Sequence, residues 1–299
     1  MHRRHHDGTP RMRTTRWIAL VRCAVAVATL VVTASCSNPP TPPTTPEVVP
    51  GLSVAPCTIK PAATNTGAAS SLEDSPTTVL QDGQTLENVR VASLDIPGRN
   101  VVVRNVEVAG KILVTGDDVT IDRVSMASIA ISSASRTTVQ YSNIGNSLED
   151  AIHITSDSGR MIKNVVLSHN YIHTPRAPKE AHYDGTQVRG IRGLRIFCST
   201  YDPGPYQQTF NAAVFIEEAN GGNKNVSVEN NWLYGFGFSI MLDSNGVRIV
   251  GNRVGGDIHW DTCAVGPKAD LASLDNRDNF NENTNAPEAM CKAPGAQSR

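Results

Sequence analysis

A frame of alternating hydrophobic and polar positions recurs eight times between Leu86 and Val254. Each copy begins with an apolar residue and carries a second apolar residue five positions later. These pairs are Leu86/Val91, Val103/Val108, Ile121/Met126, Val139/Ile144, Leu167/Ile172, Ile196/Tyr201, Val228/Leu233 and Ile249/Val254. Because the copies follow one another at intervals of 17 to 32 residues, the pattern is typical of a solenoid of stacked strands.

A second short strand follows most of these frames. It spans residues 112–114, 129–131, 152–154, 186–188, 214–216 and 240–242. Successive side chains of a strand point to opposite faces, so the middle residue of each triplet points outward. The outward residues are Leu113, Ala130, His153, Gln187, Phe215 and Met241. A row that mixes Phe, Met, His and Gln is unusual for a solvated face.

The bends between the two strands change character along the chain. The residue three places after each first member is Val89, Val106, Val124, Ser142, Asn170, Ser199, Asn231 and Asn252. Asparagines at stacked bends can form an inward ladder of amide hydrogen bonds, and asparagine also tolerates a left-handed turn conformation. Both interpretations place these residues at a bend between strands.

Two of the frames resemble the repeats of the pectin-lyase-like superfamily: residues 164–172 (Asn-Val-Val-Leu-Ser-His-Asn-Tyr-Ile) and residues 225–233 (Asn-Val-Ser-Val-Glu-Asn-Asn-Trp-Leu). The resemblance implies an all-β fold, a right-handed parallel β-helix over residues 86–254. We expect residues 51–85 to form an N-terminal cap and residues 255–299 a loop-rich C-terminal cover, because end rungs expose unpaired strand edges. A left-handed hexapeptide helix is the alternative, and the longer irregular coils disfavour it.

The first 36 residues are predicted to be a signal peptide rather than part of the fold. Several arginines precede an apolar run, residues 23–34, that is too short to span a bilayer comfortably. The run leads into Thr-Ala-Ser-Cys ending at Cys36, which resembles a bacterial lipobox, so we expect lipidation of Cys36. Residues 37–50, mostly Pro and Thr, would form an extended tether. The protein would then be exported and would contact the membrane only through its lipid anchor; ordinary secretion is the alternative.

Four cysteines lie beyond Cys36. An even number in an exported chain suggests two disulfides, for which three pairings are possible. We expect Cys263 to pair with Cys291, because this bond would pin an otherwise polar C-terminal tail. By elimination, Cys57 would then pair with Cys198.

Composition narrows the possible partners. The chain of 299 residues carries a formal net charge of −1, so a nucleic-acid partner gets no electrostatic support. Aromatic residues make up only 5% of the chain, whereas Val, Asn, Gly, Ser and Thr recur, which favours strands and turns over helices. We expect a monomer.

Titratable side chains cluster in two runs that the alternation places on neighbouring rungs. The register puts Asp150 over Asp184 and brings His153 and His182 alongside them. Stacked parallel strands lie about 4.8 Å apart, so the two carboxylates would be close enough to repel each other. Asp150, His153, His182 and Asp184 are therefore predicted catalytic residues.

Three arrangements explain the pair of aspartates. The first is a bound cation, with Ca²⁺ as the expected cofactor and Glu149, Asp150 and Asp184 as its ligands. The second is a hydrolytic site in which the two carboxylates share the acid and base roles. The third is a turn in which each carboxylate caps backbone amides. The residues alone leave all three open.

The superfamily resemblance also implies a class of activity, because its characterised enzymes largely act on polysaccharides by β-elimination or hydrolysis. Insertions between the bend and the second strand emerge from one edge and should wall a groove beside the outward row. There Arg189 would serve as base or bind a uronate carboxylate, and Gln187, Phe215 and Trp232 would bind the sugar. We expect a polysaccharide lyase acting on a uronate-containing glycan. A glycoside hydrolase using the paired aspartates and a non-catalytic glycan-binding or envelope-structural protein are the alternatives.

Overall fold

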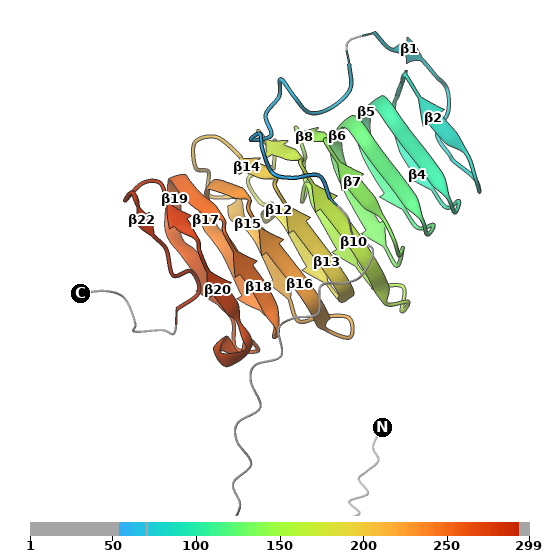
Figure 1. The fold of residues 1–299 in the computed structure, drawn as a ribbon. Coiled ribbons are helices and arrows are strands. Elements are labelled where there is room, and N and C mark those ends of the chain that lie inside the picture. Colours follow the sequence, from blue (N-terminus) through green and yellow to red (C-terminus); the bar gives the residue numbers. More distant parts are fainter. Residues whose placement is uncertain (1–53, 70, 293–299) are drawn as a thin grey trace, which may run out of the picture. The chain divides into compact units, whose positions relative to one another are not determined.

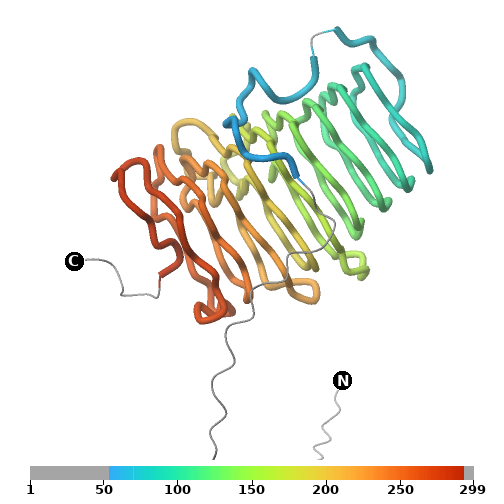
Figure 2. The backbone as a smooth tube through the Cα atoms, in the orientation of Figure 1, coloured from blue at the N-terminus to red at the C-terminus, as the bar shows by residue number. Residues whose placement is uncertain are grey.

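The computed structural model describes residues 54–69 and 71–292, which coil into a solenoid of stacked parallel strands (Figure 1). Figure 2 traces the same coils as a continuous tube. The elements are β1 Glu73–Asp74, β2 Thr85–Glu87, β3 Val89–Val91, β4 Leu94–Ile96, β5 Val101–Val114, β6 Val119–Ser132, β7 Thr138–Gln140, β8 Asn143–Gly145, β9 Ile152–Thr155, β10 Ile162–Ser168, β11 Tyr171–His173, β12 Tyr183–Arg189, β13 Ile191–Phe197, β14 Thr200–Asp202, β15 Phe210–Glu217, β16 Asn223–Glu229, β17 Trp232–Asp243, β18 Val247–Val250, β19 Arg253–Val265, the 3₁₀ turn η1 Leu271–Ser273, β20 Asp275–Arg277, β21 Phe280–Asn281 and β22 Ala286–Pro287. The predicted all-β, right-handed parallel β-helix is confirmed.

The register of the strands follows the repeat that the sequence shows. Leu86 pairs with Val103, and the row continues through Ile121, Val139, Leu167, Ile196 and Val228 to Ile249. The second strands are also in the predicted register, since Ile152 pairs with Ile129 on one side and with Thr186 on the other. From Val103 onward the first row is fully buried. Each rung therefore contributes its inward aliphatic side chains to one continuous core.

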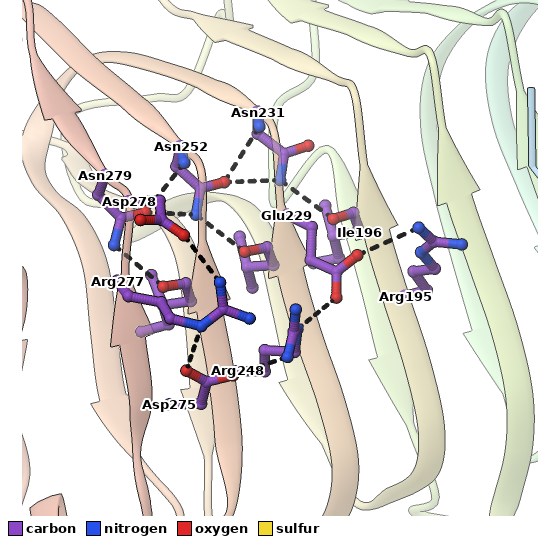
Figure 3. A network of polar contacts seen from close by, with 12 residues as sticks. Arg195, Ile196, Glu229, Asn231, Arg248, Asn252, Asp275, Arg277, Asp278 and Asn279 are labelled. Carbon is purple, nitrogen blue, oxygen red and sulfur yellow. Dashed lines mark hydrogen bonds and ion pairs between the residues drawn. The ribbon is translucent and has the colours of Figure 1, made fainter. Parts of the chain in front are cut away.

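The bends contain a buried polar ladder, and Figure 3 shows its members Asn231, Asn252 and Asn279. Asn231 Nδ2 donates to Ile196 O at 3.0 Å and to Asn252 Oδ1 at 3.0 Å. Asn231 Oδ1 accepts the backbone N–H of Ser199 at 2.9 Å, on the preceding rung. The ladder is Ser142, Asn170, Ser199, Asn231, Asn252 and Asn279. The hydrogen-bonding interpretation of these asparagines is thus confirmed.

The left-handed conformation belongs to the residue before each of the eight bend positions that the sequence frame identifies. The residues there, Asn88, Asn105, Arg123, Tyr141, His169, Cys198, Asn230 and Gly251, have φ between 49° and 68°. No ladder residue of the described chain has a positive φ. The turn-tolerance interpretation was therefore wrong for the ladder asparagines, because the sharp turn is made one residue earlier.

The rungs continue past Val254. Ile249 pairs with Asn276 of β20, and Val254 pairs with Asn281 of β21, both in parallel. The residues predicted as a loop-rich cover thus include a further rung, which β22 then borders through the antiparallel pairing of Phe280 with Pro287.

Residues 54–69, which we call the N-terminal strap, run along the bends instead of lying over the end of the solenoid. Pro56 O lies 3.4 Å from His169 Nε2, Gly67 N donates to Tyr141 O at 2.7 Å, and Ala69 N donates to Asn105 Oδ1 at 2.6 Å. From Gly67 to Ala69 the strap passes to successively earlier rungs, because Ala68 N, between these two contacts, donates to Ser125 Oγ at 3.0 Å. Residues 73–74 then form β1 and pair with β3.

Both predicted disulfides are present. Cys57 is bonded to Cys198 and fastens the strap to a bend, and Cys263 is bonded to Cys291 near the other end of the solenoid. The predicted signal peptide, Cys36 and the Pro/Thr tether lie outside the described residues. Within residues 54–69 and 71–292, no helix is long and apolar enough to cross a membrane.

Candidate active site

The two aspartates lie where neighbouring rungs enter their second strands. Asp150 precedes β9 and Asp184 is the second residue of β12, and His153 pairs with Gln187 as predicted. The backbone joins the two positions directly, because Ala151 N donates to Asp184 O at 3.1 Å. The sequence register therefore brings the carboxyl groups together.

Asp184 is buried, and its two oxygens have different surroundings. Its Oδ1 accepts from Asn211 Nδ2 at 2.7 Å and from Ala212 N at 3.0 Å. Its Oδ2 forms no hydrogen bond with any residue in the described ranges. This oxygen lies 3.8 Å from Nδ1 of His182, whose side chain is 65% exposed. Asp184 thus connects the buried bend to a solvent-exposed imidazole.

Asp150 repeats this arrangement on the neighbouring rung. Its Oδ1 accepts the Asp184 N–H at 2.9 Å, and its Oδ2 lies 3.5 Å from His153 Nδ1. The other ring nitrogen of His153, Nε2, is buried and has no hydrogen-bond partner among the described residues. The site therefore consists of two linked carboxyl–imidazole pairs. His182 presents the more exposed ring of the two.

Burial is the main cause of the shifted pKa of both carboxyl groups. It raises the pKa of Asp184 well above its ordinary value of 3.8, and the negative charge of Asp150 adds to this increase. Burial also raises the pKa of Asp150, although the Asp184 N–H and the charge of His153 oppose the change. The two groups hold protons to a higher pH than exposed aspartates do.

The structure contains the amide capping that was one of the three predicted arrangements. Both Oδ1 atoms accept backbone N–H groups of the next rung, from Asp184 and Ala212. Each Oδ2 is left to face a histidine. Each carboxyl group thus caps a backbone amide with one oxygen and faces an imidazole with the other.

The residues predicted to bind Ca²⁺ do not form a suitable cage. Glu149 Oε2 lies 3.6 Å from Lys111 Nζ, and its side chain is largely exposed. The Oδ1 atoms of Asp150 and Asp184 are occupied by N–H donors. In the described ranges, no group of three or more His, Cys, Asp and Glu residues is arranged to hold a metal ion. Calcium prefers six to eight oxygen ligands, so these three residues as placed do not fit it.

The remaining predicted residues separate into two groups. Gln187 and Phe215 pair in register beside His153, so all three belong to the outward row. Arg189 lies further along β12, with Nε 3.0 Å from Glu217 Oε2 and Nη1 3.7 Å from Asp157 Oδ1. Trp232 is the first residue of β17, next to the bend, where it pairs with Thr200 and Arg253. Neither Arg189 nor Trp232 joins the carboxyl–imidazole pairs.

The sequence interpretation missed two groups of residues. Asn211 binds Asp184 from the neighbouring rung, and its place three residues before the predicted strand 214–216 was an available signal. Tyr206, His259 and Trp260 gather on the same side of the bends, and they come from a loop and from the segment expected to be a cover. Only their aromatic character distinguished them in the sequence.

Comparison with solved structures shows what fold the chain resembles. The alginate lyase from Paenibacillus sp. str. FPU-7 has a similar fold, with a TM-score of 0.52 and 13% sequence identity over 77% of this chain and 85% of that chain. At this identity the likeness shows the fold alone. No family model matches the sequence, and no curated protein matches it.

The raised pKa of Asp184 predicts an unusual dependence of stability on pH. The folded state holds the proton in the range between the ordinary value of 3.8 and the higher folded value. The free energy of unfolding should therefore fall as pH rises from about 4 through that range. Asp184→Asn cannot ionise and should escape this loss. Between pH 4 and about 8, the melting temperature of the variant should rise steadily relative to that of the wild type.

Asp117→Asn provides a control of opposite sign. Contacts with Arg160 and Ser135 outweigh burial and lower the pKa of Asp117 to about 2, so its stabilisation is present above the ordinary value and is lost as pH falls. The melting temperature of Asp117→Asn should fall relative to that of the wild type as pH rises through about 4. If the melting temperatures of the wild type and Asp184→Asn changed in parallel with pH, this would contradict the raised pKa of Asp184.

Proposed function

We propose that the solenoid is a polysaccharide lyase that acts on a uronate-containing glycan at the two carboxyl–imidazole pairs. The observation that carries the proposal is the exposed imidazole of His182 next to the unpartnered Oδ2 of buried Asp184. A buried carboxyl behind a histidine orients the ring and stabilises its charged form. The 3.8 Å separation is long for a hydrogen bond, as is common before substrate binds.

The proposed chemistry is β-elimination, which needs a base for the C5 proton. With Asp184 ionised, His182 Nδ1–H donates to Oδ2 and leaves Nε2 free to accept that proton. The C5–H bond breaks, a C4–C5 double bond forms, and the C4–O bond to the leaving sugar breaks. His182 in its charged form then returns the proton to the departing oxygen. No step requires a metal ion.

The uronate carboxylate must also be neutralised so that its C5 proton becomes acidic. Gln187 lies in the outward row beside His153 and offers amide donors. The loop between β11 and β12 places Arg176 near the segment that leads to Asp150. Arg176 N donates to Ser147 O at 2.7 Å, and Ser147 Oγ donates to Glu149 O at 2.6 Å. Arg176 is exposed, and no ion pair joins its guanidinium to a described residue. We assign these two side chains to carboxylate recognition.

The geometry favours a lyase over a glycoside hydrolase. A hydrolase would need one carboxyl group to protonate the glycosidic oxygen directly. The side chain of Asp184 is 0% exposed and that of Asp150 is 12% exposed, so neither reaches a substrate oxygen as placed. The alginate lyase fold supports a polysaccharide as the substrate class. We further propose that the protein is exported, which its two disulfides support.

A panel of polysaccharides tests the function. The mature domain would be incubated with alginate, polygalacturonate, hyaluronan and gellan, while ultraviolet absorbance of the unsaturated product and new reducing ends are followed. A lyase produces both signals together on at least one polymer. Reducing ends without absorbance would identify a hydrolase. Retention in a polysaccharide gel without either signal would identify a non-catalytic binding protein, and either outcome would overturn the proposal.

A further inference from the structure

An exposed aromatic cluster lies on the side of the bends that carries His182. The rings of Tyr206 and His259 are stacked with centroids 3.9 Å apart and an interplanar angle of 5°. Trp260 lies 5.0 Å from Phe238 and 5.9 Å from both Tyr206 and His259. We call Tyr206, Phe238, His259 and Trp260 the aromatic platform.

The platform lies two rungs along the solenoid from the proposed active site. Beneath the surface, the buried ring of Tyr183 lies 5.8 Å from that of Phe210, and Phe210 lies 6.5 Å from Tyr206. The strand register gives the same result, because Asp184 pairs with Ala212 and Ala212 pairs with Phe238. Phe238 is therefore two rungs from Asp184, or about 10 Å at the usual strand spacing. One glycan chain laid along the solenoid would cover both.

The platform packs against the backbone although part of it faces solvent. Trp260 is 50% exposed, yet a Cβ added at Gly237 would come within 2.2 Å of its ring. The indole thus lies against the backbone of β17, where only glycine leaves enough room. Tyr206 is fixed from the other side, since its N–H donates to Asp257 Oδ2 at 3.0 Å. Fixed, exposed aromatic surface of this kind marks a binding site more often than a solvated face.

The charges around the platform indicate what it binds. Asp257 holds the Tyr206 backbone, and Asp261 follows Trp260 with its Oδ1 accepting the Thr262 N–H at 2.6 Å. Both aspartates are exposed, and no ion pair links either to a described cation. Carboxylates accept hydroxyl hydrogens and repel other carboxylates. The platform is therefore suited to an uncharged sugar ring.

We infer that the aromatic platform is a subsite that stacks on a neutral pyranose of the same glycan whose uronate lies at His182. The inference rests on the proposed function and narrows its substrate to a heteropolysaccharide, in which neutral sugars separate the uronates. The apolar face of the pyranose lies on Trp260, while Asp257 and Asp261 accept hydrogen bonds from its hydroxyl groups.

Affinity electrophoresis tests the subsite without requiring turnover. Gels would contain gellan or hyaluronan, which place neutral sugars between uronates, or alginate or polygalacturonate, which consist of uronates alone. Wild-type protein should be retarded more by the first pair. Trp260→Ala should bind that pair about fivefold more weakly, which corresponds to the roughly 1 kcal/mol that an aromatic contact contributes. Trp260→Phe should recover most of the affinity.

Ile59→Ala is the matched control, because Ile59 is a highly exposed hydrophobic residue of the strap, away from the platform. It should bind like the wild type, and all variants should melt within a few degrees of it. The inference would be overturned if Trp260→Ala were retarded as strongly as the wild type, or if the wild type bound the all-uronate polymers more strongly. It would also be overturned if none of the four polysaccharides retarded the wild type. Binding without unsaturated product would refute the lyase and leave the subsite standing.

Discussion

His182→Ala is expected to lower turnover by about 10²- to 10⁴-fold, the usual contribution of a positioned general base. The substitution removes the imidazole that faces Asp184 Oδ2 and leaves both Oδ1 capping bonds in place. Because His182 is mostly exposed, the melting temperature should stay within a few degrees, as surface changes cost under about 1 kcal/mol. Initial rates from product absorbance, measured at saturating and at low polysaccharide concentration, provide the test.

Glu180→Ala is the matched control for that experiment. Glu180 is an exposed neighbour in the same loop, so its removal should leave turnover unchanged. Asp184→Asn should also inactivate the enzyme, because an amide cannot hold His182 in the required tautomer, and it should do so with little change in binding. If His182→Ala retains wild-type rates, the base lies elsewhere, and the carboxyl–imidazole pairs are structural.

Removing the Cys57–Cys198 disulfide should cause the largest loss of stability in the molecule. The bond joins residues 141 positions apart, and a loop of that length corresponds to about 5 kcal/mol of unfolded-chain entropy. The Cys263–Cys291 bond spans only 28 positions, which corresponds to about 3.5 kcal/mol. Replacing both cysteines of a pair by serine avoids a free thiol. Urea unfolding of the two double variants should show this order.

The strap should detach first in the Cys57→Ser/Cys198→Ser variant, because its other contacts with the rungs are non-covalent: single hydrogen bonds, the contact with His169 and the cation–π contact of Lys60 with Tyr234. Limited proteolysis within residues 54–69 should therefore become much faster, while the rungs stay protected. Equal losses of stability in the two double variants would contradict the loop-length explanation and would point to local packing around each bond.

The repeat itself could be predicted from the sequence because the inward row is aliphatic from Leu86 to Ile249. The same criterion explains why the last rung was missed. Its inward positions are Asn276 and Asn281, so a search for paired apolar residues ends at Val254. The strap could not be found by periodicity either, since it contacts the bends mainly through backbone groups such as Gly67 N.

The pairing of the two aspartates was predictable because it follows from strand register alone. Which oxygen of each carboxyl caps an amide depends on bend geometry that no pattern encodes. Arg189 was placed with the site because it shares the outward side of β12, but five residues along a strand correspond to about 16 Å. The sequence pattern does not predict the platform, because Tyr206 and Trp260 are brought together only by the folded loop.

The two disulfides also decide how the chain would carry mechanical load. Tension applied to its two ends would pass from Cys57 directly to Cys198 and from Cys263 directly to Cys291. The chain between the members of each bonded pair would bear no load while the bonds stay oxidised. Between the two disulfides, the stretch from Cys198 to Cys263 would bear the load, and it contains the aromatic platform. Asp150, His182 and Asp184 lie inside the loop closed by Cys57 and Cys198, which bears no load. A pulling force would therefore deform the proposed binding subsite before the proposed catalytic pairs.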